Sequence, residues 1–209
     1  MNRPLTAAAL AVALFVAACS GGPSEADMLA KARDYVARQD HRAATVQLKS
    51  LLQQNGQNAE ARYLLGRSLL EQGDVKAAEL ELRKASDLRF DPAKVTPLLA
   101  RALLGQGENA ALTGQFASVR LADAAAQAEL SVAVATAFLA QKMNEQGEEA
   151  LAEALKAQPQ HVPARLLQAR VLADKEQVAE ARDLVDQVLA SDANAADAWM
   201  LKGELALNI

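Results

Sequence analysis

Cys19 is the only thiol in this 209-residue chain, and it stands directly after the longest apolar run. A thiol can serve as a nucleophile, a metal ligand, a disulfide partner or an attachment point. One cysteine excludes an internal disulfide, and no cluster of Cys and His suggests zinc. The small residues Ala17 and Ala18 precede Cys19. We therefore interpret Cys19 as an attachment point and not as a catalyst.

A row of arginines is the second set of residues that could do chemistry. Arginine binds carboxylates and phosphates through a planar fork of N–H groups. Four arginines follow one another at intervals of 34, 34 and 69 residues: Arg33, Arg67, Arg101 and Arg170. The row predicts a surface for an acidic peptide or a segment of an anionic polymer. Glu71 and Asp174 lie four residues after Arg67 and Arg170, so local pairing is expected there, while Arg33 and Arg101 lack such a partner.

The other polar residues give no support to catalysis. His41 and His161 are far apart, and neither has a metal-binding partner at helical spacing. The stretch GQGENA at 105–110 matches G-x-G-x-x-A, but a dinucleotide site needs a strand before that loop, and a helical pattern precedes it here. We predict no catalytic residue, no metal and no cofactor. An enzyme subunit with hidden hydrolytic activity is the alternative from another class.

Composition favours helices as the elements that position these residues. Hydrophobic residues make up 51% of the chain and aromatic residues only 3%, so the apolar content is mostly Ala, Leu and Val. Ala and Leu lose little entropy in helices, whereas strands favour β-branched and aromatic residues. The net charge is −4 and the pI about 5.3. A nucleic-acid partner is not expected, because such proteins carry a basic surface.

The N-terminal segment has the layout of a secretory signal. Arg3 supplies a positive charge, and the apolar run that follows is too short to span a bilayer comfortably. The sequence VAAC, residues 16–19, resembles a bacterial lipobox. The resemblance implies cleavage before Cys19, lipid attachment to its sulfur, a signal peptide at 1–18 and a lipidated tether at 19–24. Alternatives are an ordinary signal peptide with an incidental cysteine, or an N-terminal membrane anchor.

Small residues recur through the rest of the chain with a period of about 34. They lie at Ala32, Gly66, Ala100, Ala135, Ala169 and Gly203, at intervals of 34, 34, 35, 34 and 34. A second set, Ala44, Ala78 and Ala181, is followed four residues later by Leu48, Leu82 and Val185. Antiparallel helices approach closely only where side chains are small, and larger neighbours fill the gaps. The spacing therefore predicts stacked pairs of helices, each incomplete without its neighbours.

Turn and cap residues fall between the predicted helices. Gly73-Asp74 and Gly107-Glu108 are typical of turns, and Asp40 and Asp74 are expected to cap second helices. Pro92 and Pro159 stand where second helices should end. Gly114 and one extra residue interrupt the third unit, so we expect a shortened or broken helix near 114–121.

These repeats resemble the tetratricopeptide repeat (TPR) family across residues 25–209. The resemblance implies an all-α, right-handed α-solenoid of about five repeats plus a final helix. A non-repetitive helical bundle is the alternative. In TPR arrays the first helices line a concave groove, which would place the arginine row on its wall. Apolar positions expected to share the groove, or else to be partly buried packing residues, are Leu29, Tyr63, Leu70, Leu104 and Leu166.

The final helix, AADAWMLKGELALNI, has no second helix after it in the sequence. It either caps the array or presents an apolar end to another chain or to further repeats.

The N-terminal segment together with the repeats resembles the TPR-repeat lipoproteins of the exosortase/PEP-CTERM system, the PrsT family. The resemblance covers an N-terminal portion, because members of that family are several times longer. It implies a membrane-anchored scaffold that binds protein partners and is linked to exopolysaccharide and protein sorting. Ser20 after Cys19 resembles Gram-negative signals for the outer membrane, facing the periplasm. The alternative within binding proteins is a pilotin or an outer-membrane assembly lipoprotein.

Overall fold

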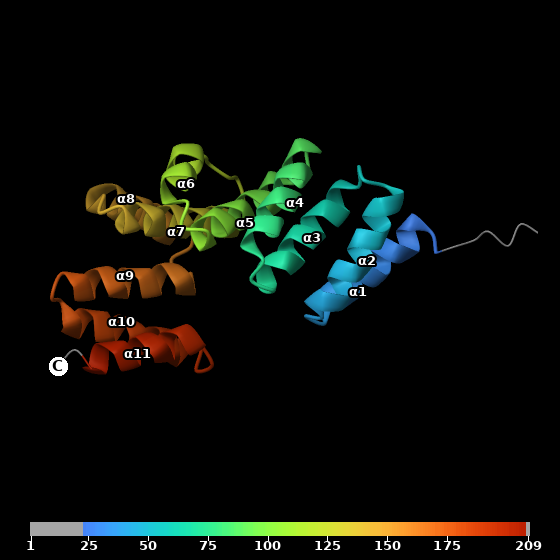
Figure 1. The fold of residues 1–209 in the computed structure, drawn as a ribbon. Coiled ribbons are helices and arrows are strands. Elements are labelled where there is room, and N and C mark those ends of the chain that lie inside the picture. The colour runs from blue at the N-terminus through green and yellow to red at the C-terminus, as the bar shows by residue number, and fades with distance from the viewer. Residues whose placement is uncertain (1–22, 208–209) are drawn as a thin grey trace, which may run out of the picture.

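The computed structural model describes residues 23–207, which form α-helices and no strand within that range. The predicted signal peptide and Cys19 lie outside the described residues. The helices are α1 (Glu25–Ala37), α2 (His41–Gln54), α3 (Ala59–Glu71), α4 (Val75–Asp87), α5 (Pro92–Gly105), α6 (Asn109–Phe116), α7 (Ala124–Ala140), α8 (Asn144–Ala157), α9 (Val162–Asp174), α10 (Val178–Ser191) and α11 (Ala196–Leu207). They stack as successive pairs from the blue α1–α2 pair to the red α11 at the opposite end (Figure 1). This is the predicted all-α repeat solenoid.

Small residues make the contacts within each pair, as the sequence period predicts. Ala32, Ala100, Ala135 and Ala169 are all fully buried. Gly66 on α3 shows why size matters, since a Cβ added there would lie 2.6 Å from Cγ of Leu82 on α4. Buried leucines fill the space beside the crossing points, among them Leu48 and Leu82. The helices of a pair are therefore held by close packing around a small residue.

Caps and turns follow the predicted residues. Asp40 Oδ1 accepts a hydrogen bond from the Ala43 N–H at 3.0 Å, and Asp74 Oδ1 accepts one from the Ala77 N–H at 3.2 Å. Gly73 has a φ of 80°, in the left-handed region that glycine adopts without strain. Pro159 follows the end of α8. Pro92, by contrast, is the first residue of α5, five residues after α4 ends, where its fixed φ favours helix initiation.

The third repeat is irregular, as Gly114 and the extra residue predict. Its second helix, α6, has only 8 residues, and the chain from 117 to 123 is not helical before the 17-residue α7 begins. The apolar core nevertheless continues through this region. Leu112 and Phe116 of α6 are buried in the same cluster as Leu130 and Val134 of α7. The sequence pattern is interrupted here, but the packing is not.

A repeated polar contact links neighbouring repeats. The residue that follows a first helix bonds to the second helix of the preceding repeat, four times along the array. The contacts are Gln72 Nε2 to Thr45 Oγ1 (2.8 Å), Gln106 Nε2 to Glu79 Oε2 (2.6 Å), Gln141 Nε2 to Thr113 Oγ1 (3.3 Å) and Lys175 Nζ to Glu148 Oε2 (2.6 Å). In the first three, the glutamine also donates to a backbone carbonyl of its own helix. These bonds fix the stacking of consecutive pairs.

The last helix, α11, buries one face and exposes another. Ala198, Leu201 and Leu205 pack into the cluster formed by α9 and α10. Trp199 is 53% exposed, with Lys202 Nζ lying 5.4 Å from the centre of its ring. Met200 and Leu207 are also exposed, so the outer face of α11 mixes apolar and charged side chains. None of the described helices is both long enough and apolar enough to span a bilayer.

Candidate ligand groove

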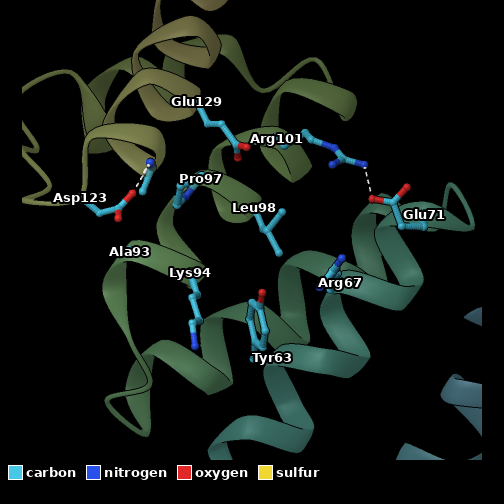
Figure 2. Close-up of a pocket in the computed structure, with 11 residues that line it drawn as sticks. Tyr63, Arg67, Glu71, Ala93, Lys94, Pro97, Leu98, Arg101, Asp123 and Glu129 are labelled. Carbon is cyan, nitrogen blue, oxygen red and sulfur yellow. Dashed lines mark hydrogen bonds and ion pairs between the residues drawn. The ribbon is translucent and has the colours of Figure 1, made fainter. Parts of the chain in front are cut away.

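First helices of four successive repeats form a groove made of two adjoining cavities. The first, of about 340 Å³, is lined by residues of α3, α5 and the start of α7, including Tyr63, Arg67, Lys94, Leu98 and Arg101. The second, of about 250 Å³, extends toward the start of α9. Pro97, Arg101 and Glu129 line both cavities, which makes them one continuous surface. In Figure 2, Tyr63 and Leu98 face one another across the space between α3 and α5.

The structure divides the arginine row into two groups. Arg67 and Arg101 line the groove, whereas Arg33 on α1 and Arg170 on α9 lie outside its two cavities. Arg33 donates from Nε and Nη2 to the two carboxylate oxygens of Glu60, both at 2.6 Å. These hydrogen bonds, followed by the attraction of the charges, raise the pKa of Arg33 above its usual value. Arg33 is therefore engaged with the neighbouring repeat and lies outside the groove.

The expected local pairs of Arg67 with Glu71 and of Arg170 with Asp174 are wrong. Glu71 instead accepts from Arg101 Nη2 of the next repeat at 2.8 Å (Figure 2), and Arg170 lies 3.4 Å from Glu204 of α11. First helices lie side by side in the stack, so a residue about 30 positions away is as near as one four positions away. As a result Arg67 makes no ion pair among residues 23–207.

The apolar groove positions also divide. Tyr63 and Leu104 line the groove and are half-buried, and the Tyr63 ring stacks on Phe90 with centroids 4.9 Å apart. Leu70 and Leu166 are only 7% and 6% exposed, so they are packing residues and the expectation that they contact a ligand is corrected. Leu29 packs partly buried against the core of the first repeats.

Sequence reasoning missed a second row of charged residues on the groove. Lys94 and Glu129 line it. Lys94 stands six residues before the small residue Ala100, and Glu129 stands six before Ala135. Glu60 has the same position relative to Gly66. That shared register is the signal that would have found them. Glu129 gives the α7 side a negative charge opposite the unpaired Arg67 and the Lys94 ammonium. The groove therefore carries charges of both signs, with Glu71 of α3 engaged by Arg101, and is not uniformly basic.

His161, for which the sequence indicated no metal-binding partner, lines the second cavity and is half-buried. It occupies the N-cap of α9 without making a cap hydrogen bond, and its Nδ1 is buried with no partner among the described residues. Burial lowers the pKa of His161 below 6.5, and attraction to Glu129 opposes this shift only in part. The charged form is therefore disfavoured in the folded protein.

The depressed pKa predicts that acid destabilises the array at this histidine. Below about pH 6.5 the unfolded chain binds a proton that the folded chain does not, so stability falls as the pH is lowered toward the folded-state pKa. His161→Gln should reduce this pH dependence. His161→Asn should do so as well and add an N-cap acceptor that contributes about 1 kcal/mol. Urea unfolding at about pH 7.5 and about pH 5.5 measures both; an unchanged pH dependence in the two variants contradicts the assignment.

The fold and the groove define an α-solenoid of the kind that binds other polypeptides. The family model for the tetratricopeptide repeat matches residues 35–102 and 138–205, which together exceed half of the chain. The chain belongs to the tetratricopeptide repeat family. The two matched stretches leave out 103–137, where the third repeat is irregular.

Solved structures of TPR proteins show the same fold. A thermophilic TPR protein of Thermus thermophilus is 18% identical, with 88% of this chain and 100% of that chain aligned at a TM-score of 0.67. PilF of Pseudomonas aeruginosa is 19% identical over 88% of this chain and 83% of its own, with a TM-score of 0.68. YrrB is described as a TPR protein with an unusual peptide-binding site. It is 16% identical, with 86% of this chain and 92% of that chain aligned at a TM-score of 0.57. No curated protein matches the sequence.

Proposed function

We propose that this protein is a scaffold whose groove binds an extended segment of a protein partner. One observation carries the proposal: Arg67 makes no ion pair among the described residues, although Arg33, Arg101 and Arg170 of the same row each do. Arg67 lines the cavity together with the apolar side chains of Tyr63 and Leu98. A cation next to apolar surface in an open cavity suits a peptide with an acidic side chain near an apolar one. The peptide-binding site described for YrrB supports this use of the fold.

The charges of the groove refine the ligand class. Arg67 and Lys94 favour acidic side chains on the α3–α5 side, and Glu129 favours a donor on the α7 side. A peptide offers both kinds of group together with apolar side chains for Tyr63 and Leu98. A uniformly anionic polymer would place like charge against Glu129 and Asp123. We therefore favour an acidic peptide segment over the anionic polymer.

Replacing Arg67 and Lys94 together with alanine should weaken binding of such a partner about tenfold or more at low salt. Arg67 makes no ion pair among residues 23–207, and the Lys94 ammonium lies over the Phe90 ring, 5.7 Å from its centre, without an ion pair of its own in that range. Arg33→Ala is the matched control, since it removes an arginine of the same row that is engaged with Glu60 outside the groove. Partners captured from cell envelopes by crosslinking, followed by titration of the recovered partner, provide the measurement. Equal losses in the control and in the double variant would contradict the groove as the binding site.

We also propose that the protein is anchored in the envelope through lipid on Cys19, at the outer membrane facing the periplasm, and takes part in exopolysaccharide or PEP-CTERM protein sorting. The lipobox-like VAAC and the short segment before α1 support the anchor. Several acyl chains on one cysteine hold a protein firmly, because each buried CH₂ contributes about 0.8 kcal/mol. The mass of the mature N-terminus, compared between the natural chain and Cys19→Ala, tests it. An N-terminus other than modified Cys19 would refute the anchor and leave the groove untouched.

A pilotin or an outer-membrane assembly lipoprotein is the alternative role. The similarity to PilF makes it worth testing, although at 19% identity that similarity concerns the fold alone. The identity of the crosslinked partner separates the two roles. A hydrolase screen on the chain beginning at Ser20 addresses the hidden-enzyme alternative.

A further inference from the structure

The outer surfaces of α2 and α4 carry the same three-residue pattern in register. On α2, Arg42 and Lys49 flank Val46, and on α4, Lys76 and Arg83 flank Leu80. Each of the three residues on α2 stands 34 positions before its counterpart on α4. Val46 is 71% exposed and Leu80 is 55% exposed, so neither contributes much to the core. We refer to these six residues as the α2–α4 outer face.

Later repeats do not keep this pattern, although their helices occupy the same positions in the stack. The counterparts on α6 and at its end are uncharged: Ala110, Gly114 and Ala117. The counterparts on α8 and α10 are Glu145, Glu149 and Ala152, then Ala179, Asp183 and Asp186. At these three positions the second helices thus change from basic and apolar in the first two repeats to acidic or small in the last two. TPR packing does not require either chemistry, because these side chains point outward.

The cations of the α2–α4 outer face are largely free. Among residues 23–207, Arg42, Lys49 and Lys76 make no ion pair, and only Arg83 does, with Glu79 at 2.8 Å. Helix α2 contains no acidic residue at all. A basic helix surface with an exposed aliphatic residue at its centre is typical of segments that lie on anionic lipid. Both helices pack against α3 and not against each other, so the α2–α4 outer face consists of two exposed strips, with Arg42 at the edge of a cavity that Asp40 and Glu71 also line.

The start of α1 lies beside the end of α2. Asn55 and Asn58, which follow α2, donate to the carboxylate of Glu25 at 3.0 and 2.6 Å. The inference rests on the proposed anchor, because a tether of six residues, 19–24, spans at most about 20 Å. An anchor on Cys19 would therefore hold this end of α2 within about 20 Å of the membrane surface.

We propose that the α2–α4 outer face rests on an anionic phospholipid surface. The four cations contact lipid phosphates, and Val46 and Leu80 enter the headgroup region. The occupant is a membrane because the charges are complementary to anionic headgroups and the tether starts beside the residues that follow α2. The groove belongs to the first helices, so this docking leaves Arg67 and Lys94 open to partners.

The test uses the chain beginning at Ser20, which keeps every described helix and all of their mutual contacts but lacks both lipid and signal peptide. It is mixed with vesicles of neutral phosphatidylcholine, or of phosphatidylcholine with about 30% phosphatidylglycerol, and co-sedimentation is measured. Binding is expected to the anionic vesicles only and to fall steeply as salt is raised. Lys49→Gln with Lys76→Gln should weaken binding about 25-fold, or about fivefold for each cation.

Two further variants separate the contributions. Val46→Ser with Leu80→Ser should weaken vesicle binding about tenfold while keeping its salt dependence, because no charge is removed. Lys142→Gln with Lys156→Gln removes the same charge from exposed sites in the fourth repeat and should leave binding within about twofold of the natural chain. The groove variant Arg67→Ala with Lys94→Ala should bind vesicles almost normally, so failure of the groove proposal and failure of this one are distinguishable.

Three results would overturn the membrane assignment. One is equal binding to neutral and anionic vesicles. Another is an equal loss in the Lys142 and Lys156 control, which would make the effect one of net charge. The third is unchanged binding to anionic vesicles by Lys49→Gln with Lys76→Gln, which would place the contact elsewhere on the protein.

Discussion

Replacing Leu82 with alanine is expected to lower the free energy of unfolding by about 2–5 kcal/mol. Leu82 is fully buried, and its Cγ lies 2.6 Å from the point where a Cβ on Gly66 would stand. It also joins α4 to the core cluster that continues through α5 and α7. Neighbouring helices cannot collapse onto the space left by the leucine, because the close approach of α3 and α4 is already set by Gly66. The loss therefore includes both the buried surface and a cavity.

Leu80→Ala is the matched control for Leu82→Ala. Both leucines belong to α4 and both changes have the same effect on helix propensity, but Leu80 is 55% exposed. We expect Leu80→Ala to change stability by no more than about 0.5 kcal/mol. Urea unfolding followed by circular dichroism gives both values. Similar losses for the two variants would show that α4 does not pack as described.

Arg62→Met should destabilise the array by about 3 kcal/mol, toward the low end of the range for a broken buried ion pair. Arg62 Nη1 contacts Glu81 at 2.5 Å, with side-chain exposures of 17% and 12%, and Arg62 Nη2 donates to the Gly56 carbonyl at 3.0 Å. The change leaves Glu81 buried with only Lys84 as its partner and the Gly56 carbonyl without these donors. Because both side chains keep some contact with water, the loss of stability should be smaller than for a completely buried ion pair.

The same pair gives the prediction a pH signature. Burial raises the pKa of Glu81, but hydrogen bonds from Lys84 and Arg62 and the attraction of both cations outweigh it, so the pKa is lowered overall. A depressed carboxyl pKa stabilises the fold above the unfolded value, about 4.5, and that stability is lost as the pH falls through the folded-state pKa. As the pH falls from about 5 to about 3, the free energy of unfolding should therefore decrease less in Arg62→Met than in the natural chain.

Arg83→Met is the control for Arg62→Met, because the Arg83–Glu79 pair is partly exposed and lies within one helix. We expect it to cost at most about 1 kcal/mol. Equal costs for the two arginines would contradict the role given to the buried pair.

The fold was predictable from the sequence because its determinants are local and repeated. A small residue about every 34 positions marks the crossing within each of the five pairs of residues 23–207, and Ala32, Ala100, Ala135 and Ala169 are fully buried as a result, whereas Gly203 of the unpaired α11 is exposed. Aspartates after turns identify the helix starts, since the cap bond joins residues three apart. Gly114 likewise locates the short helix. Each of these signals acts within one repeat.

The groove was predictable only in part, because its chemistry depends on contacts between repeats. The positions of Arg67 and Arg101 on the groove follow from the repeat period. The ion-pair partner of Arg101, however, is Glu71, thirty positions earlier. Such partners depend on how far each pair rotates relative to the last, which no local pattern specifies. The exposed fraction of an apolar side chain also depends on how neighbouring repeats pack. Leu70 and Leu166 share the pattern of groove residues, yet packing of adjacent pairs buries them.

The short helix α6 has a consequence for how such a chain can change over generations. Between Ala100 and Ala135 one residue has been added to the usual period, and the 117–123 connection accommodates it. Leu112, Phe116, Leu130 and Val134 keep the interior filled across this stretch. We therefore expect the 117–123 connection to accept small changes in length provided that the apolar volume is conserved. A change in length there would fall beside a continuous core, so it would not divide the array into two independently folding parts.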